Sequence, residues 1–262
     1  MLQHFLVQFF ISLFIFTFAH ADTIKPGKKI PPATAKAQAV SAQKLLDNLT
    51  DSVQKQYNGI KSATFDFEQS YKHPFLNISQ TSKGSVAYIK ASGKMVWSYL
   101  EPKDKQKKFF IDGKKLTVYY VSDKNAFVHD CYEEDTLSSS VAFLIGTGQL
   151  KQSFTISALE GESTNKSLSW ITLTPKQKDA PVKRIFLGIN KASKVEESIV
   201  EDLRDGKNHF KFINFKTNPT IPANTFVFSP PKGVVVQKMP NVSCPAAKTN
   251  EKTPDTKKSQ KK

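Results

Sequence analysis

The sequence predicts a mainly β protein, an antiparallel meander of about ten strands with few helices. Three observations lead to this prediction. From residue 63 onward, apolar and polar residues alternate over many short segments, which is the period of a half-buried strand. These segments follow one another at intervals of about 8–15 residues, with turn-forming residues between them. Hydrophobic residues make up 39% of the 262 residues, so the chain can form a core and is not disordered as a whole.

The N-terminus is predicted to direct export. Residues 1–21 contain an apolar run from Phe5 to Phe18, followed by Ala19-His20-Ala21, the small-x-small pattern that signal peptidase recognises. We expect a Sec-type signal peptide cleaved after Ala21, and the periplasm as the location. The alternative is an uncleaved anchor, although the run is shorter than the roughly 20 residues that span a bilayer.

A linker and one long helix are expected before the strands. Residues 22–40 are rich in Pro, Lys and Ala, which predicts a flexible linker. From Val40 to Ile60 apolar residues recur at spacings of three and four, the stripe of an amphipathic helix. Asn58-Gly59 forms a suitable C-terminal stop.

The first group of strands contains most of the aromatic side chains. Phe65, Phe67 and Tyr71 alternate with polar residues, and a second strand is expected over residues 84–90. A third strand places Met95, Trp97 and Tyr99 on one face. Asp112-Gly113 then separates two alternating segments, residues 108–111 and 116–121, which is a strong hairpin signal.

The second half begins with a break in the strand pattern. Residues 136–146 read as a short apolar helix that ends at Gly146. Strands are then expected near residues 154–158, 168–174, 185–190, 195–203, 209–215 and 225–228. Residues 237–262 form a basic tail, which we expect to be disordered. The domain itself is therefore expected over residues 41–236.

The net charge of +15 belongs disproportionately to the two flanks. Residues 22–40 hold four Lys and one Asp, and residues 237–262 hold seven Lys and two acids. Only two arginines occur, Arg184 and Arg204. Specific nucleic-acid readers favour arginine for bases and phosphates. A nucleic-acid partner is therefore not expected, and solubility explains the basic flanks.

No motif predicts catalysis, a metal or a cofactor. The best candidate constellation is His129, Cys131 and Glu133, which would be the site of a secreted metal or thiol enzyme; a solvated acidic hairpin is the simpler interpretation. Cys131 and Cys244 are the two cysteines. In an oxidising compartment they either form a disulfide, worth up to about 4–5 kcal/mol for so long a loop, or remain two free thiols.

Aromatic side chains on a sheet with few covering helices suggest an apolar binding protein. Such a sheet must close on itself or keep a cavity, and a curved sheet with an apolar face can hold a lipid-like ligand. For any single side chain, ordinary core packing is the simpler interpretation. The pattern by itself indicates an apolar binder and no particular ligand.

Several segments carry short motifs in a characteristic order. Residues 63–69 (ATFDFEQ) resemble an early "F-x-Q" strand, and residues 84–99 (GSVAYIKASGKMVWSY) resemble a "G-x-F-x-W-x-Y" hairpin. Residues 111–116 (IDGKKL) match a "DGK-x-L" turn. Residues 226–234 (FVFSPPKGV) match a closing "F-x-F-x-P-P-x-G-V". In their order and spacing across about residues 39–236, these segments resemble the LolA family of periplasmic lipoprotein carriers.

The resemblance implies an incomplete antiparallel β-barrel of about ten to eleven strands, with short helices covering the open side. It implies a non-enzymatic monomer that carries acylated lipoproteins from an inner-membrane lipoprotein-releasing transporter to an outer-membrane acceptor, either a receptor or the membrane. The implied acyl-chain cavity comprises Phe65, Phe67, Met95, Trp97, Tyr99 and Leu116. The implied lid comprises Val141, Phe143, Leu144 and Ile145.

One departure from the family pattern concerns closure of that lid. Ala91-Ser92 stand where the family often has an Arg-Pro pair, and Lys90 is the neighbouring cation. Lysine lacks the planar fork of arginine, so a different closing contact is expected. A lipoprotein-sensing or regulatory protein on the same fold is the alternative function.

Overall fold

The computed structural model describes residues 32–76, 78–130, 132, 148–159, 165–178, 180 and 182–239. The chain divides into two compact units, Met1–Ser41 and Ala42–Lys262. Helix α1, Pro32–Asn58, begins in the first unit and ends in the second. The signal peptide, the proposed cleavage site and the tail beyond residue 239 lie outside the described residues.

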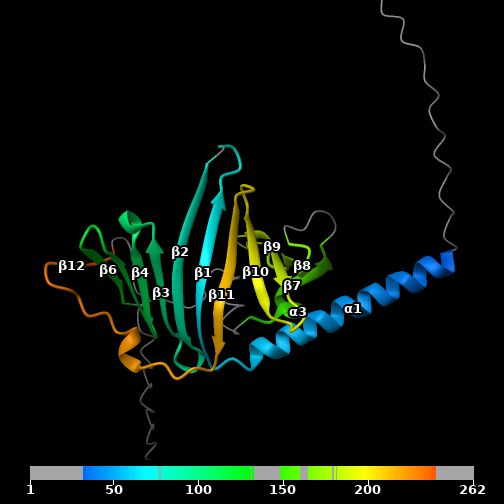
Figure 1. Cartoon of the computed structure of the whole chain (residues 1–262), viewed down its shortest axis with the longest axis horizontal. Helices are drawn as coiled ribbons and strands as arrows, with labels where there is room; N and C mark the ends of the chain where they lie inside the picture. Colours follow the sequence, from blue (N-terminus) through cyan, green and yellow to red (C-terminus); the bar gives the residue numbers. More distant parts are fainter. Residues whose placement is uncertain are drawn as a thin grey trace, which may run out of the picture. The chain divides into compact units, whose positions relative to one another are not determined.

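The second unit is built around one twelve-stranded sheet (Figure 1). Every pair of neighbouring strands is antiparallel except β12, which runs parallel to β6. The strand order is β12-β6-β5-β4-β3-β2-β1-β11-β10-β9-β8-β7. The strands are β1 Ser62–Lys72, β2 Ser79–Ile89, β3 Lys94–Glu101, β4 Lys107–Asp112, β5 Lys115–Tyr120, β6 Asn125–His129, β7 Phe154–Ala158, β8 Ser169–Pro175, β9 Val182–Ile189, β10 Val195–Asp202, β11 Lys207–Thr217 and β12 Val235–Lys238.

Short helical turns connect some of these strands. They are η1 Lys90–Ser92, η2 Lys103–Lys105, α3 Leu150–Ser153 and η4 Ala223–Phe226. The predicted Asp112-Gly113 hairpin is confirmed, since Asp112 pairs with Lys115 and Gly113 has a φ of 61°. Glycine adopts this left-handed conformation without a steric penalty. Among the described residues, no helix combines the length and apolarity needed to cross a membrane.

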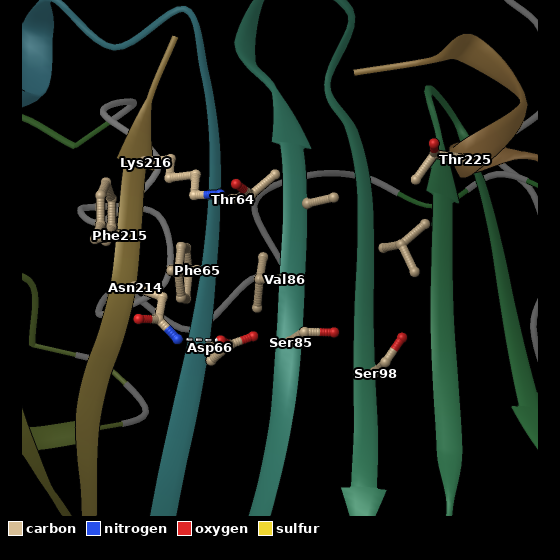
Figure 2. Close-up of a pocket in the computed structure, with 12 residues that line it drawn as sticks. Thr64, Phe65, Asp66, Ser85, Val86, Ser98, Asn214, Phe215, Lys216 and Thr225 are labelled. Atoms are coloured by element: carbon tan, nitrogen blue, oxygen red, sulfur yellow. Dashed lines mark hydrogen bonds between the residues drawn. The ribbon is translucent and has the colours of Figure 1, made fainter. Parts of the chain in front are cut away.

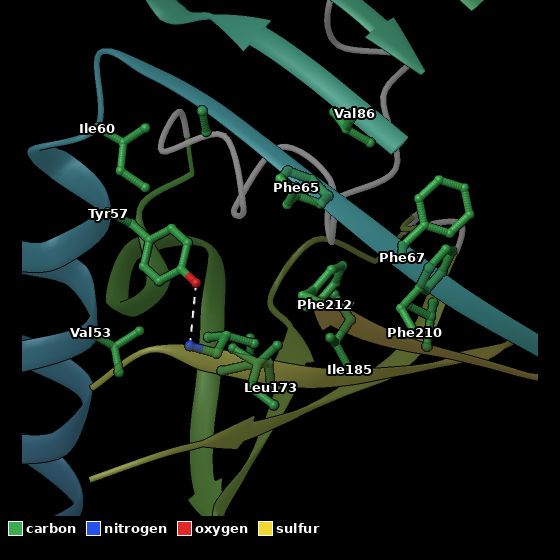
Figure 3. Packing of buried hydrophobic residues seen from close by; sticks show 14 of the residues in the cluster. Val53, Tyr57, Ile60, Phe65, Phe67, Val86, Leu173, Ile185, Phe210 and Phe212 are labelled. Atoms are coloured by element: carbon green, nitrogen blue, oxygen red, sulfur yellow. Dashed lines mark hydrogen bonds between the residues drawn. The ribbon is translucent and has the colours of Figure 1, made fainter. Parts of the chain in front are cut away.

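The two faces of the sheet differ because side chains alternate along each strand. On β1, Ala63, Phe65 and Phe67 are buried, whereas the intervening Thr64 and Asp66 point to the opposite face. The buried side chains form one cluster, here called the apolar face (Figure 3). Its strand residues are Ala63, Phe65, Phe67, Val86, Tyr88, Met95, Trp97, Ile111, Phe154, Ile171, Leu173, Val182, Ile185, Leu187, Ile189, Val195, Val200, Phe210 and Phe212.

Helix α1 packs its C-terminal half against the apolar face. Val53 and Tyr57 are fully or almost fully buried, and both point toward the sheet in Figure 3. The Tyr57 hydroxyl accepts a hydrogen bond from the backbone N–H of Val195 at the start of β10, 3.3 Å away. This contact fixes the helix at one end of the apolar face.

The chain beyond β11 returns across the opposite face. Phe226 of η4 is fully buried. The ring of Phe228 lies 5.4 Å from the rings of both Phe110 and Tyr119, which belong to β4 and β5. The opposite face of this part of the sheet is therefore covered by the chain's own C-terminal segment.

The predicted mainly β, incompletely closed fold is confirmed: the sheet is open, with β12 and β7 at its two edges. The strand count differs from the expected ten to eleven. Strands β6 and β12 were not predicted, and β12 extends to Lys238, past the expected domain boundary at residue 236. The strand predicted over residues 225–228 is wrong, because residues 223–226 form the turn η4.

The start of α1 also differs from the prediction. The helix begins at Pro32, inside the stretch expected to be a flexible linker. Proline suits the first turn of a helix because the N–H it lacks would have no intrahelical acceptor there. Four alanines follow within residues 33–39, and alanine has the highest helix propensity. Local propensity therefore extends the helix beyond its apolar stripe.

Candidate apolar binding face

A continuous group of aromatic rings forms the centre of the apolar face. The Phe67 ring lies 4.9 Å from Trp97 and 5.2 Å from Tyr99. The Phe65 ring stacks on Phe215 at 5.0 Å. Edge-to-face and offset aromatic contacts of this kind stabilise by about 0.5–1.5 kcal/mol each beyond the burial of area.

The six residues predicted to line an acyl-chain cavity all lie on this face. Phe65 and Phe67 come from β1, Met95 and Trp97 from β3, and all four belong to the buried cluster. Tyr99 of β3 and Leu116 of β5 are half-buried and pack against it. The strand register brings Leu116 into line with Met95, since Ile111 of β4 pairs with both.

Gly84 allows the Phe67 ring to lie flat over β2. Gly84 is the residue directly opposite Phe67 in the register. A Cβ atom at residue 84 would lie 2.5 Å from the Phe67 ring and 1.9 Å from the carbonyl oxygen of Ser98. Because real Cβ atoms do not approach so closely, the aromatic centre requires glycine at this position.

Half of the apolar face was not predicted. Phe210 and Phe212 of β11 extend the aromatic centre, and Phe215 packs at its edge. Beyond them the face is aliphatic. Its members there are Ile171 and Leu173 of β8 and Ile185, Leu187 and Ile189 of β9. The alternation at residues 185–189 and 209–212 predicts strands with one apolar side. It does not reveal whether that side joins the same face of the sheet as Phe65 and Trp97.

A few polar groups are buried among these apolar side chains. Trp97 Nε1 and Ser198 Oγ are buried without a hydrogen-bond partner in the described structure. Burial raises the pKa of the Tyr99 phenol. Unpaired buried polar groups are rare because each costs about 1–3 kcal/mol. These groups could therefore pair with a polar part of a ligand.

A small hollow opens beside the helix end of the apolar face. It measures about 260 Å³, and Tyr57, Ile60, Val195, Phe212 and Phe215 supply its apolar lining. The space lies where α1, β10 and β11 meet, next to the Tyr57–Val195 hydrogen bond.

A larger hollow of about 740 Å³ has a lining that mixes apolar groups with polar and charged ones (Figure 2). Thr64, Asp66, Ser85 and Ser98 contribute to it from the face of the sheet opposite Phe65. The amide of Asn214 donates to Asp66 Oδ2 at 2.8 Å within it. Asp66 and Lys216 also place charged groups in this lining. Because a charge that loses its water costs free energy, the larger volume does not by itself make this hollow the site for an acyl chain.

The predicted lid residues Val141, Phe143, Leu144 and Ile145 lie outside the described residues. The structure does show what holds the chain on both sides of residues 133–147. The N–H of Tyr132 donates to the carbonyl of Lys114 at 2.7 Å. On the other side, the Gln54 side chain of α1 donates to the carbonyl of Gly148 and accepts from the N–H of Leu150, at 3.1 and 2.7 Å.

The other predicted features are only partly described. Cys131, Cys244 and Glu133 lie outside the described residues. His129 ends β6, with its ring edge-on to Tyr132 at 6.3 Å. Within the described ranges, no three His, Cys, Asp or Glu side chains are grouped so as to hold a metal ion. Ala91 and Ser92 are exposed in the turn η1, between β2 and β3.

The fold and the aromatic face define an open-sheet β protein with one continuous apolar face. Residues 58–229 match the family model for the outer membrane lipoprotein carrier protein LolA, and the chain therefore belongs to the LolA family. An outer-membrane lipoprotein carrier protein of Cupriavidus pinatubonensis is 31% identical over 217 residues, covering 80% of this chain and 99% of the relative.

Other known proteins are similar over most of this chain. A protein of the same name from Bordetella pertussis is 29% identical over 209 residues, covering 79% of this chain and 91% of its own. Among solved structures, a LolA superfamily protein from Nitrosomonas europaea matches with a TM-score of 0.39 and 11% identity, covering 70% of this chain and 97% of that one.

Proposed function

We propose that this protein is a periplasmic carrier that holds the acyl chains of lipoproteins against its apolar face and ferries them from the inner to the outer membrane. The observation that carries the proposal is the continuous aromatic and aliphatic face in a chain of the LolA family. The signal peptide, with cleavage after Ala21, would deliver it to the periplasm. It would receive cargo from an inner-membrane lipoprotein-releasing transporter, deliver it to an outer-membrane acceptor, and catalyse no reaction.

The energetics of acyl chains explain why such a face is needed. Each CH₂ group removed from water contributes about 0.8 kcal/mol, so a long acyl chain cannot cross the aqueous periplasm unprotected. The cargo must also leave at its destination. The affinity for the chains must therefore stay moderate, because very tight binding would slow their release.

The aromatic centre supplies the wall against which the chains would lie. Phe65, Phe67, Met95 and Trp97 form its buried part, and Tyr99 and Leu116 form the half-buried rim. Where the acyl chains end, esters and amides present carbonyl oxygens. Trp97 Nε1 and Ser198 Oγ, which lack partners in the described structure, would donate hydrogen bonds to such carbonyls.

The segment with Val141, Phe143, Leu144 and Ile145 would cover bound chains as a lid. Its support in the described structure is Gln54, which holds the chain just beyond the segment with two hydrogen bonds. Lys151 adds an ion pair to Asp51 of α1, with the Nζ and Oδ1 atoms 2.6 Å apart. Both side chains are half-exposed or more, so this pair contributes little to stability.

The test is native mass spectrometry of the mature protein, purified from the host periplasm without detergent. We expect adducts with the masses of acylated lipoproteins. Leu116→Glu places a charge on the rim of the apolar face and should abolish the adducts. The matched control is Ile213→Glu, an exposed apolar position on the opposite face of β11.

Two results would contradict the carrier function. One is an unliganded mass for the wild-type protein that persists after incubation with membranes rich in lipoproteins. The other is an equal amount of adduct in the Leu116→Glu variant and the Ile213→Glu control, both folded by circular dichroism, which would place the cargo away from the apolar face.

A further inference from the structure

Two neighbouring hairpin tips expose large apolar side chains at the same end of the sheet. One tip joins β1 to β2 and the other joins β10 to β11, and Figure 1 shows both protruding together. Phe75 is 82% exposed, Leu76 53% and Ile78 51% in the first tip, and Leu203 is 68% exposed in the second. Exposed apolar patches of this kind mark interaction sites.

Side-chain hydrogen bonds hold both tips in shape. In the first, His73 Nδ1 accepts from the backbone N–H groups of Phe75 and Leu76, at 3.2 and 3.1 Å. In the second, Asp202 Oδ1 accepts from the N–H groups of Arg204 and Gly206, at 2.8 and 2.9 Å. The exposed side chains are thus presented by ordered turns, which reduces the entropy lost on binding.

The two tips also contact one another. Gly206 lies so close to β1 that a Cβ atom there would be 2.7 Å from the Tyr71 hydroxyl oxygen. A hollow of about 620 Å³ lies between the tips, lined by Tyr71, His73 and Phe75 on one side and by Leu203 and Arg204 on the other. The patch is therefore one surface made by two hairpins.

The charges around this surface favour an anionic partner. Lys72, Arg204 and Lys207 form no ion pair within the described part of the chain, whereas Asp205 pairs with Lys183 and Asp202 is engaged in its own turn. Unpaired cations next to exposed aromatic and aliphatic side chains are the combination that binds the interface of an anionic bilayer.

We propose that the two tips form a membrane-contacting surface that inserts Phe75 and Leu203 into the interface of an anionic phospholipid bilayer. The tips stand clear of the apolar face: Lys72 follows Phe67 by five residues along an extended strand, which is about 16 Å. A narrow protrusion reaches a bilayer more readily than it buries the roughly 1,000 Å² expected of a specific protein interface. The proposal is independent of what the apolar face binds.

Vesicle co-sedimentation of the full mature protein tests this surface. The vesicles consist of phosphatidylcholine with or without phosphatidylglycerol. We expect binding to the anionic vesicles, and a loss of about tenfold or more in partition coefficient for the double variant Phe75→Ser/Leu203→Ser. Leu45→Ser is the matched control, because Leu45 of α1 is 70% exposed against 68% for Leu203; it should bind as the wild type does.

A second pair of variants tests the electrostatic part. Lys72→Gln/Arg204→Gln should weaken binding to the anionic vesicles by several-fold and leave the residual binding to neutral vesicles unchanged. A Phe75→Trp variant should show a blue shift of tryptophan emission when anionic vesicles are added, since its side chain would leave water.

Three outcomes would overturn the proposal. The wild type does not bind anionic vesicles, the serine variant binds as tightly as the Leu45→Ser control, or the Phe75→Trp emission does not shift. The second would assign vesicle binding to the lysine-rich flanks. Acyl-chain adducts in native mass spectrometry should be the same for the serine variant and the wild type, so failure here is distinct from failure of the carrier function.

Discussion

Tyr57 joins α1 to the sheet through a single hydroxyl group. Its ring is buried beneath the helix, and its oxygen accepts the hydrogen bond from Val195 N–H. Burial raises the pKa of this phenol far above its usual value near 10, and the hydrogen bond from Val195 offsets only part of that shift. Because burial disfavours the charged phenolate, the folded protein favours the protonated form.

The sign of the resulting pH dependence is fixed by the direction of this shift. Because the folded protein holds the proton more tightly than the unfolded chain, Tyr57 does not penalise folding below about pH 10 and lowers the free energy of unfolding as the pH rises above it. We expect Tyr57→Phe to lower the free energy of unfolding by about 0.5–1.5 kcal/mol at pH 8. Between pH 9 and 11, the free energy of unfolding of the variant should fall less steeply than that of the wild type. Urea unfolding at several pH values measures both, and parallel pH profiles would contradict this assignment.

The face of the sheet that a residue joins was predictable only where alternation is unbroken. Phe65, Phe67, Met95 and Trp97 follow the two-residue period and were placed correctly on one face. On β11 the period fails at Asn214, which has a φ of 55° and lies where the β1–β11 register shifts. This irregularity returns Phe215 to the apolar face, where it stacks on Phe65. A bulge changes the face that a side chain joins, and local sequence gives little warning of it.

Among the elements, those with the shortest alternating runs were the ones misread. β6 has five residues, and its apolar side chains are shared between both faces, so its period is weak. Residues 225–228 alternate as a strand would, but they lie between Pro222 and Pro230, and Phe226 reaches the opposite face from a helical turn. Proline cannot donate a hydrogen bond to a neighbouring strand. The alternation therefore reflects the burial of Phe226 and not a strand.

Strand β2 depends on having no side chain opposite Phe67. We predict that Gly84→Ala lowers the free energy of unfolding by about 1–3 kcal/mol, because the new methyl group overlaps the Phe67 ring and the Ser98 carbonyl. Chemical denaturation measures this loss. Gly113→Ala is a control at a glycine with open space around it, where only the strain of a positive φ of 61° applies. Equal losses would show that the contact with Phe67 is unimportant.

For the whole molecule, the order of the motifs along the chain predicted the fold better than any single motif did. The hairpin around Asp112-Gly113 forms as the sequence predicts, and the sheet is open as the resemblance implies. Local periodicity could not show which strands become neighbours at a distance, such as β1 beside β11 or β12 beside β6. Those pairings depend on the sum of all contacts, and so does the aliphatic half of the apolar face.

Ligand binding should stabilise the whole domain by mass action. A synthetic triacylated lipopeptide that binds only the folded protein should add about 2.7 kcal/mol at a hundred times its dissociation constant. We expect Tm to rise by several degrees in calorimetry. The rise should be retained in Ile213→Glu and lost in Leu116→Glu. A rise of the same size in both variants would place the lipopeptide away from the apolar face.

The unjoined edges β7 and β12 have one further consequence. The radius of a closed barrel is fixed by its number of strands and their shear, so it cannot widen without breaking hydrogen bonds. An open sheet has no such constraint. A change of a degree or two in the twist between each pair of neighbouring strands leaves every ladder intact, and its effect accumulates across the sheet. The same chain can therefore adjust its curvature to cargoes of different girth, with the deformation shared among many strand pairs and concentrated in none.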